Sequence, residues 1–250
     1  EITPCDSFKL VFEAVGNNEV DYGVVAIENS LYGTINPVVD LLLKKNLWVM
    51  GEVFLRINHC LIGMPKAKKN DIKEIYSQIM ALAQCENYID SNFPNAKIIE
   101  YHDTVASVEH VKKIGDSSKA AIASQESANL HHMQILDTEI EDNKQNYTRF
   151  MVLAKDKPVN QNNDKTSIVL ETSKDKVSGS LHNALGIFAD QKINLTMLHS
   201  RPIHGKAWHY MFYVDLEIGA NDNRFTNSLQ ELKNLGWQTK ILGSYKSGNL

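Results

Sequence analysis

The sequence is poor in several features that mark common classes of protein. It has three cysteines in 250 residues, Cys5, Cys60 and Cys85, and no Cys-x-x-Cys pair. An odd number at these spacings argues against a disulfide framework and a zinc site, so we expect all three thiols to be reduced. Lys and Arg number 26 against 30 Asp and Glu, which gives a formal net charge of −4. The chain therefore lacks the basic excess that nucleic-acid binding requires, and we expect no such partner.

Long apolar runs and cofactor motifs are also missing. No apolar run approaches the roughly 18 residues of a membrane-spanning helix, and the N-terminus has no basic-then-apolar signal pattern, so we predict a cytoplasmic protein without a membrane partner. The glycine-containing stretch 29–33 lacks the spacing of a dinucleotide fingerprint or a phosphate loop. His131 and His132 are adjacent, so they do not share a helix face. We therefore expect no nucleotide cofactor and no metal.

Alternating patterns dominate residues 8 to 155. Apolar runs of strand length alternate with stretches of helical period, which is typical of βα units and predicts a largely parallel sheet. We expect a second α/β lobe, at about 64–137, inserted into a first lobe made of about 1–63 and 138–156. The predicted strands are 22–27, 47–51, 54–62, 97–101, 120–123 and 147–154, and the predicted helices are 34–45, one ending near 88, and 104–113.

The C-terminal third has a different plan. Residues 157–165 are polar, contain Pro158 and show no period, which indicates a linker. Residues 166–250 then predict strands at 167–171, 195–199, 208–217 and 239–242, with helices at 179–191 and 223–235. This βαββαβ order is the ferredoxin-like plan.

Polar side chains follow several predicted strands, where open α/β sheets bind ligands. Glu28-Asn29-Ser30 ends one strand, and its backbone N–H groups with the Asn29 and Ser30 side chains suit a carboxylate. Thr148 and Arg149 stand at the start of the apolar run 151–154 and suit a small anionic substrate. Thr104 and Ser124 repeat the arrangement at other strand-to-helix junctions. For each junction the alternative is an ordinary helix cap or surface turn.

Taken in order, these segments resemble those of prephenate dehydratases. The segments that carry the resemblance are Glu28-Asn29-Ser30 with Gly33, His59-Cys60-Leu61, Thr104-x-Ala106, Ala120 to Ser124, and Asn146-x-Thr148-Arg149-Phe150. The C-terminal part resembles that family's ACT regulatory domain, because Gly179-Ser180-Leu181 is similar to its Gly-Ala-Leu motif. Asn194-Leu195-Thr196 followed by His199-Ser200-Arg201-Pro202 is similar to its Glu-Ser-Arg-Pro segment.

The resemblance implies an α/β fold with a bilobal, periplasmic-binding-protein-like catalytic domain at 1–156 and an ACT domain at 166–250. It implies a cofactor-independent lyase that converts prephenate to phenylpyruvate, water and carbon dioxide in phenylalanine biosynthesis. Thr148 is then the expected donor to the leaving hydroxyl, with Arg149 anchoring a carboxylate or structuring the site and Glu28 orienting water or holding the lobes. Substrate contacts are expected from Asn29, Ser30, Thr104, Ser124 and Asn146.

Regulation is implied in the same way. Phenylalanine is expected to bind where ACT domains of two subunits meet, in a homodimer or homotetramer. The expected effector-binding residues are Gly179, Ser180, Leu181, Asn194, Leu195, His199, Ser200, Arg201 and Pro202. His199 replaces the family's usual Glu, which predicts weakened or retuned feedback.

Two alternatives stay open from the sequence, arogenate dehydratase and a non-catalytic amino-acid sensor. The family's glycine-rich opening strand does not appear, so we expect an N-terminal piece ahead of Glu1. The lyase interpretation makes one geometric prediction. The corner just past Ile27, with Asn29, and the corner ahead of Met151, with Thr148, should face each other across a single groove between the lobes, sized for a doubly charged six-membered ring.

Overall fold

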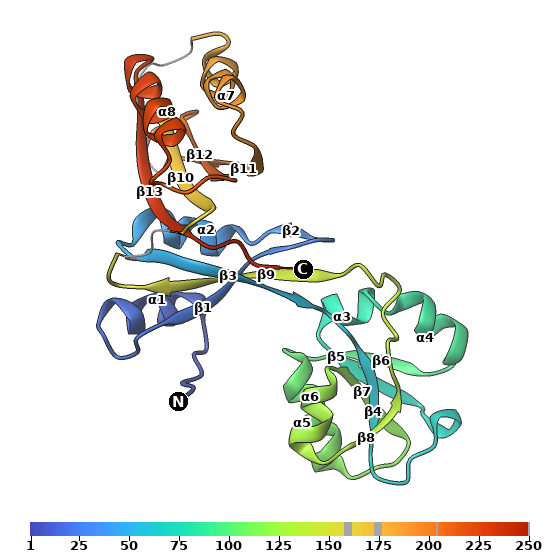
Figure 1. Cartoon of the computed structure of the whole chain (residues 1–250). Helices are drawn as coiled ribbons and strands as arrows, with labels where there is room; N and C mark the ends of the chain where they lie inside the picture. The colour runs from blue at the N-terminus through green and yellow to red at the C-terminus, as the bar shows by residue number, and fades with distance from the viewer. Residues whose placement is uncertain (158–161, 173–176, 204, 250) are drawn as a thin grey trace. The chain divides into compact units, whose positions relative to one another are not determined.

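The computed structural model describes residues 1–157, 162–172, 177–203 and 205–249. It divides into two compact units, the first made of Glu1–Leu55 with Thr148–Leu250 and the second of Arg56–Tyr147 (Figure 1). These divisions fall several residues from the predicted lobe limits near 63 and 138. No helix in the described residues is long and apolar enough to cross a membrane.

The first unit contains a four-stranded sheet of order β2-β1-β9-β3. Its strands are β1 (Gly23–Asn29), β2 (Gly33–Thr34), β3 (Trp48–Arg56) and β9 (Tyr147–Ala154). β1 pairs antiparallel with both β2 and β9, so the prediction of a largely parallel sheet is wrong here. Hydrophobic periodicity specifies which residues are buried but not the direction in which a returning strand enters the sheet.

Two helices accompany this sheet, α1 (Phe8–Gly16) and α2 (Asn36–Lys44). The helix predicted at 34–45 is confirmed, with Pro37 in its first turn, where a missing N–H is tolerated. Val38, Val39 and Leu42 lie on the buried face of α2. Burial of each such side chain contributes roughly 1.5–3 kcal/mol to the stability of the fold. The apolar face therefore fixes the position of α2, which follows Asn29 in the chain.

The C-terminal part has the predicted βαββαβ order, which is confirmed. It consists of β10 (Lys165–Thr172), α7 (Ser180–Asp190), β11 (Leu195–Pro202), β12 (Tyr210–Leu216), α8 (Asn223–Asn234) and β13 (Trp237–Tyr245). The sheet order is β11-β12-β10-β13, and its neighbouring strands are antiparallel. Of the predicted linker, residues 158–161 lie outside the described residues.

The two sheets of the first unit share a hydrophobic core. Ile168 and Leu170 of β10 pack with α7 and α8, whereas Val169 belongs to the core that contains Met151 and Leu153 of β9. Alternate residues of a strand point to opposite faces. The C-terminal sheet therefore has its helices on one face and the first sheet's core on the other.

The second unit contains a mixed sheet of order β6-β5-β7-β4-β8. Its strands are β4 (Cys60–Gly63), β5 (Glu74–Ser77), β6 (Lys97–Glu100), β7 (Lys119–Ala123) and β8 (Gln134–Asp137). β5 runs parallel to β6 and β7, whereas β4 runs antiparallel to β7 and β8. Its helices are η1 (Lys69–Asp71), α3 (Ile79–Ala83), α4 (Glu86–Asn92), α5 (Thr104–Ile114) and α6 (Gln125–His131).

Two predictions for this region are wrong. The single strand expected at 54–62 is instead the end of β3 at Arg56 and a separate β4 that begins at Cys60. The helix expected to run through 88 is divided between α3 and α4 at Cys85, which has φ −121° and ψ 19°. In both places apolar residues stand on each side of the break, so the sequence pattern gave no sign of the change of backbone direction.

Candidate functional site

Asn29 and Thr148 lie side by side across β1 and β9. They are register partners in the antiparallel ladder, and Asn29 Nδ2 donates a hydrogen bond of 3.1 Å to Thr148 Oγ1. Asn29 Oδ1 accepts from the backbone N–H groups of Leu31 and Tyr32, at 3.0 and 3.1 Å. The amide is thus held at both ends, and the Thr148 hydroxyl, which accepts in this bond, retains its own proton to donate. The two residues lie on the same side of the molecule, as predicted, but the prediction that they face each other across a groove between the lobes is wrong. Because β9 pairs directly with β1, both belong to one sheet of the first unit.

Glu28 and Arg149 form the neighbouring register pair of the same two strands. Because successive residues of a strand point to opposite faces, this pair lies on the other face of the sheet from Asn29 and Thr148. Arg149 Nη1 stands 3.9 Å from Glu28 Oε2. The three residues predicted to be catalytic therefore lie on two faces of the sheet, Thr148 on one and Glu28 with Arg149 on the other, and they do not converge on a single point.

Arg149 is surrounded by acceptors from three other strands. Its Nε donates to Glu52 Oε2 on β3 at 2.7 Å, its Nη1 to Asp215 Oδ2 on β12 at 2.6 Å, and its Nη2 to Tyr245 OH on β13 at 3.2 Å. The residue is only 5% exposed. Burial by itself would lower the pKa of the guanidinium, but Asp215 and Glu52 hold that pKa above its ordinary value. Arg149 thus joins the first sheet to the C-terminal sheet.

Lys165 completes a charge-balanced cluster around Arg149. Its Nζ lies 2.9 Å from both carboxylate oxygens of Glu52, and Ser167 Oγ donates to Asp215 Oδ1 at 2.5 Å. Two buried carboxylates therefore face two buried cations. A balanced, hydrogen-bonded cluster offsets its desolvation, whereas removal of one member leaves an unpaired buried charge.

Sequence reasoning missed these partners of Arg149. A signal was present, since Glu52 and Asp215 each interrupt an otherwise apolar strand segment. A carboxylate in a buried strand normally has a cationic partner. The sequence did not show which cation pairs with Glu52, because Glu52 and Arg149 are separated by 97 positions.

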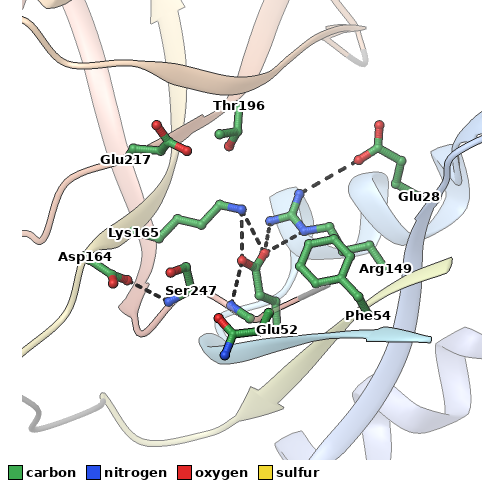
Figure 2. Close-up of a pocket in the computed structure, with 11 residues that line it drawn as sticks. Glu28, Glu52, Phe54, Arg149, Asp164, Lys165, Thr196, Glu217 and Ser247 are labelled. Carbon is green, nitrogen blue, oxygen red and sulfur yellow. Dashed lines mark hydrogen bonds and ion pairs between the residues drawn. The ribbon is translucent and has the colours of Figure 1, made fainter. Parts of the chain in front are cut away.

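A cavity of about 760 Å³ opens beside the cluster (Figure 2). Glu28 and Arg149 reach it from the first sheet, while Thr196 and Glu217 reach it from the C-terminal part. Most of the charged groups on its wall are already paired with one another. Its remaining lining residues are Glu52, Phe54, Asp164, Lys165, Ser247, Gly248 and Asn249.

The predicted effector residues occupy two ends of the C-terminal domain. Gly179, with φ 77°, caps α7, and Ser180 and Leu181 line a hollow of about 170 Å³ together with Thr172, Trp208, His209, Tyr210, Phe212 and Trp237. Asn194 lies beyond the far end of α7, where its Nδ2 donates to Glu217 Oε2 at 2.8 Å. An eleven-residue helix separates the two groups, about 16 Å at 1.5 Å per residue, so one chain does not bring them together.

The segment that includes His199 and Arg201 instead contacts α2. Arg201 forms a bidentate pair with Asp40, with N–O distances of 2.8 and 2.7 Å. His199 Nε2 lies 2.8 Å from Asn36 Oδ1. Burial, followed by the charge of Arg201, lowers the pKa of His199. This segment therefore contacts α2, the helix that follows Asn29 in the chain.

The remaining predicted substrate residues, Thr104, Ser124 and Asn146, belong to the second unit. Ser124 is the N-cap of α6, as the alternative interpretation predicted, with its Oγ accepting from Ser127 N at 3.3 Å. Thr104 is not a cap, because Asp103 caps α5 and accepts from Ala106 N at 2.7 Å. Asn146 is fully buried. In the part of the chain that the structure describes, no cluster of His, Cys, Asp and Glu is placed to hold a metal ion.

Comparison with known proteins gives matches along nearly the whole chain. The family described as Prephenate dehydratase matches residues 1–158, and the ACT domain family matches residues 167–234. The bifunctional chorismate mutase/prephenate dehydratase of Aquifex aeolicus (strain VF5) is 37% identical over 97% of this chain and 66% of the relative. Arogenate dehydratase 5, chloroplastic, of Arabidopsis thaliana is 36% identical over 98% of this chain and 61% of the relative.

A solved structure gives a similar result. The prephenate dehydratase of Arthrobacter aurescens in complex with L-Phe matches with a TM-score of 0.87 and 28% identity, over 97% of this chain and 80% of that one. The α/β class and the trailing ACT domain are thereby confirmed. The chain spans less than two thirds of the length of the two curated relatives, 66% and 61%.

Proposed function

Because this chain belongs to the prephenate dehydratase family, we propose that it catalyses the decarboxylating dehydration of prephenate to phenylpyruvate in phenylalanine biosynthesis. The observation that carries the proposal is the hydrogen-bonded pair of Asn29 and Thr148. These two residues lie 119 positions apart in the sequence, and the fold makes them neighbours at the ends of paired strands.

The reaction requires little more than an oriented substrate and one proton donor. Prephenate loses carbon dioxide and its ring hydroxyl together, and aromatisation of the ring makes the reaction strongly downhill. The site must bind a dianion, desolvate the departing carboxylate and donate a hydrogen bond to the leaving hydroxyl. We assign that donation to Thr148, whose hydroxyl is oriented by Asn29. General acid catalysis of this kind contributes roughly two to four powers of ten.

Two roles were predicted for Arg149, anchoring a substrate carboxylate and structuring the site. We assign it the second. Its Nε, Nη1 and Nη2 groups donate to protein acceptors, which supports a role in structuring the sheet rather than in anchoring a substrate carboxylate. Glu28 lies beside it on the same face and is proposed to support the same strand end. Ser30, Thr104, Ser124 and Asn146 stay proposed substrate-binding residues, to be tested by single alanine substitutions that should raise KM.

The direct test replaces Thr148 in the full-length protein. Thr148→Ala should lower kcat for phenylpyruvate formation about 100-fold or more, whereas Thr148→Ser, which keeps the hydroxyl, should retain most of it. Asn29→Ala should lower kcat by a smaller factor, because it removes only the partner that orients the hydroxyl. Wild-type turnover by Thr148→Ala would remove Thr148 from the mechanism.

Arogenate is the second candidate substrate, because a relative of 36% identity is named an arogenate dehydratase. It differs from prephenate in carrying an α-amino group in place of the keto group. Measuring kcat/KM for both compounds with one enzyme preparation decides between them. A chain that binds phenylalanine but turns over neither compound would instead be the non-catalytic sensor.

Phenylalanine is the proposed allosteric effector, supported by the ACT domain and by the name of the Arthrobacter complex. Because Gly179 and Asn194 lie at opposite ends of α7, we propose that residues from two subunits complete each effector site in a homodimer or homotetramer. Titration calorimetry with phenylalanine at increasing protein concentration tests both points. The affinity should rise as the subunits associate, and no heat at any concentration would contradict feedback.

Localisation in the cytoplasm stays a prediction.

A further inference from the structure

The ladder that pairs β1 with β9 is irregular close to Thr148. In the ladder between β1 and β9, Ala26 pairs with Phe150 and Glu28 pairs with Arg149, so Ile27 is an extra residue on β1. A bulge of this kind interrupts the regular hydrogen bonds and bends the strand locally. Pairing with β1 therefore holds the Thr148 end of β9 less firmly than a regular ladder would.

Arg149 supplies the fixation that the bulge removes. Three of its nitrogen atoms are bound by Glu52, Asp215 and Tyr245, which belong to three different strands. A planar guanidinium held at three points has a fixed position and orientation. Because Thr148 is the adjacent residue of the same strand, its backbone is then held in place too, with its side chain on the opposite face.

Two of the three groups that hold Arg149 come from the C-terminal domain. Asp215 is fully buried on β12, and Tyr245 is 1% exposed on β13. Ser167 of β10 contacts both, at 2.5 Å to Asp215 Oδ1 and 2.7 Å to Tyr245 OH. The anchor is therefore itself fixed by hydrogen bonds within the C-terminal sheet.

We propose that Asp215 and Tyr245 are positioning residues for the dehydratase reaction, acting on Thr148 through Arg149. This inference rests on the proposed function. The domain assigned to regulation thus also completes the structural support of the catalytic strand. A displacement of about 1 Å at a reacting group is enough to lower a rate about 100-fold, so small losses of order at β9 should appear in turnover.

The kinetic test uses Asp215→Asn in the full-length protein, a change that keeps the side-chain shape and removes the charge. We expect kcat to fall at least tenfold, with KM changed less than twofold. Tyr245→Phe, which removes one hydroxyl, should lower kcat about threefold. The matched control is Thr166→Val, because Thr166 is equally buried on β10 but bonds to Ile218 O and Ser244 Oγ, away from Arg149. Its kcat should stay at the wild-type value even if its stability falls.

A double variant tests whether the effect passes through Thr148. In the Thr148→Ala background, Asp215→Asn should lower kcat no further, because the group that it positions is already absent. Full additivity of the two losses would overturn the proposal. So would equal losses of kcat in Asp215→Asn and Thr166→Val, since a general loss of folding explains both.

A readout without turnover separates this inference from the proposed function. Backbone amide exchange in peptides covering residues 147–150 should become faster in Asp215→Asn and in Tyr245→Phe but not in Thr166→Val. Unchanged exchange in both variants would overturn the positioning role, whatever the kinetics. If the wild-type protein makes no product from prephenate or arogenate, the proposed function fails, and exchange still decides whether the C-terminal domain orders β9.

Discussion

Glu52 offers the sharpest test of the buried cluster. Its two carboxylate oxygens accept from Arg149 Nε and Lys165 Nζ, and its side chain is 1% exposed. Glu52→Gln keeps the shape but leaves the two buried cations with Asp215 as the one buried carboxylate of the cluster. Breaking a buried pair in this way costs about 3–5 kcal/mol, against a total stability of roughly 5–15 kcal/mol for a typical domain.

The expected change is large enough to measure by calorimetry. For a protein of this size each kcal/mol lowers Tm by about 2–4 °C, so Glu52→Gln should lower Tm by roughly 6–20 °C. Because the core of the first unit contains residues of both sheets, both sheets should lose stability together. The matched control is Glu171→Gln, which breaks a largely exposed pair with Lys206 and should change stability by less than about 1 kcal/mol.

A compensating substitution separates charge from shape. Glu52→Gln combined with Lys165→Met removes one charge of each sign and should recover part of the lost stability, as a double-mutant cycle would show. If Glu52→Gln lowers Tm no more than Glu171→Gln does, the buried cluster does not hold the two sheets together. Arg149 would then not be a fixed anchor.

Three further outcomes follow from the contacts and pKa shifts. Reversing the charge of Arg201 or of Asp40 alone should destabilise the protein more than reversing both charges together, because only the double variant keeps an opposite-charge pair; denaturation curves measure the difference. Burial and the charge of Arg201 lower the pKa of His199 from 6.5. The folded chain therefore binds a proton at His199 less readily than the unfolded chain does. Stability should thus be fully present above pH 6.5 and decline below it, with a smaller decline in His199→Gln. Cys5 is exposed and the other two cysteines are buried with raised pKa values, so a thiol reagent should label Cys5 rapidly and all three only after denaturation.

The sequence determined the local structure and the ingredients of the site. Period-two and period-3.6 burial, which each segment carries in itself, predicted the C-terminal βαββαβ order, helix α2 and strand β9. The polar residues at the strand ends were also visible, including Asn29 and Thr148. The resemblance to a family and the rule that ligands bind at strand ends predicted that both belong to one site, but placed them across a groove between the lobes and not as partners on paired strands of one sheet.

Only the tertiary structure decided how these elements meet. Strand direction depends on the path of the chain outside the strand, so the antiparallel pairing of β1 and β9 could not be read from their periodicity. The partners of Arg149 lie 97, 66 and 96 positions away, and local patterns carry no information about such pairings. Folding turned a residue that the sequence presented as a candidate anion anchor into the junction of four strands, because buried charges must find opposite charges wherever the chain brings them.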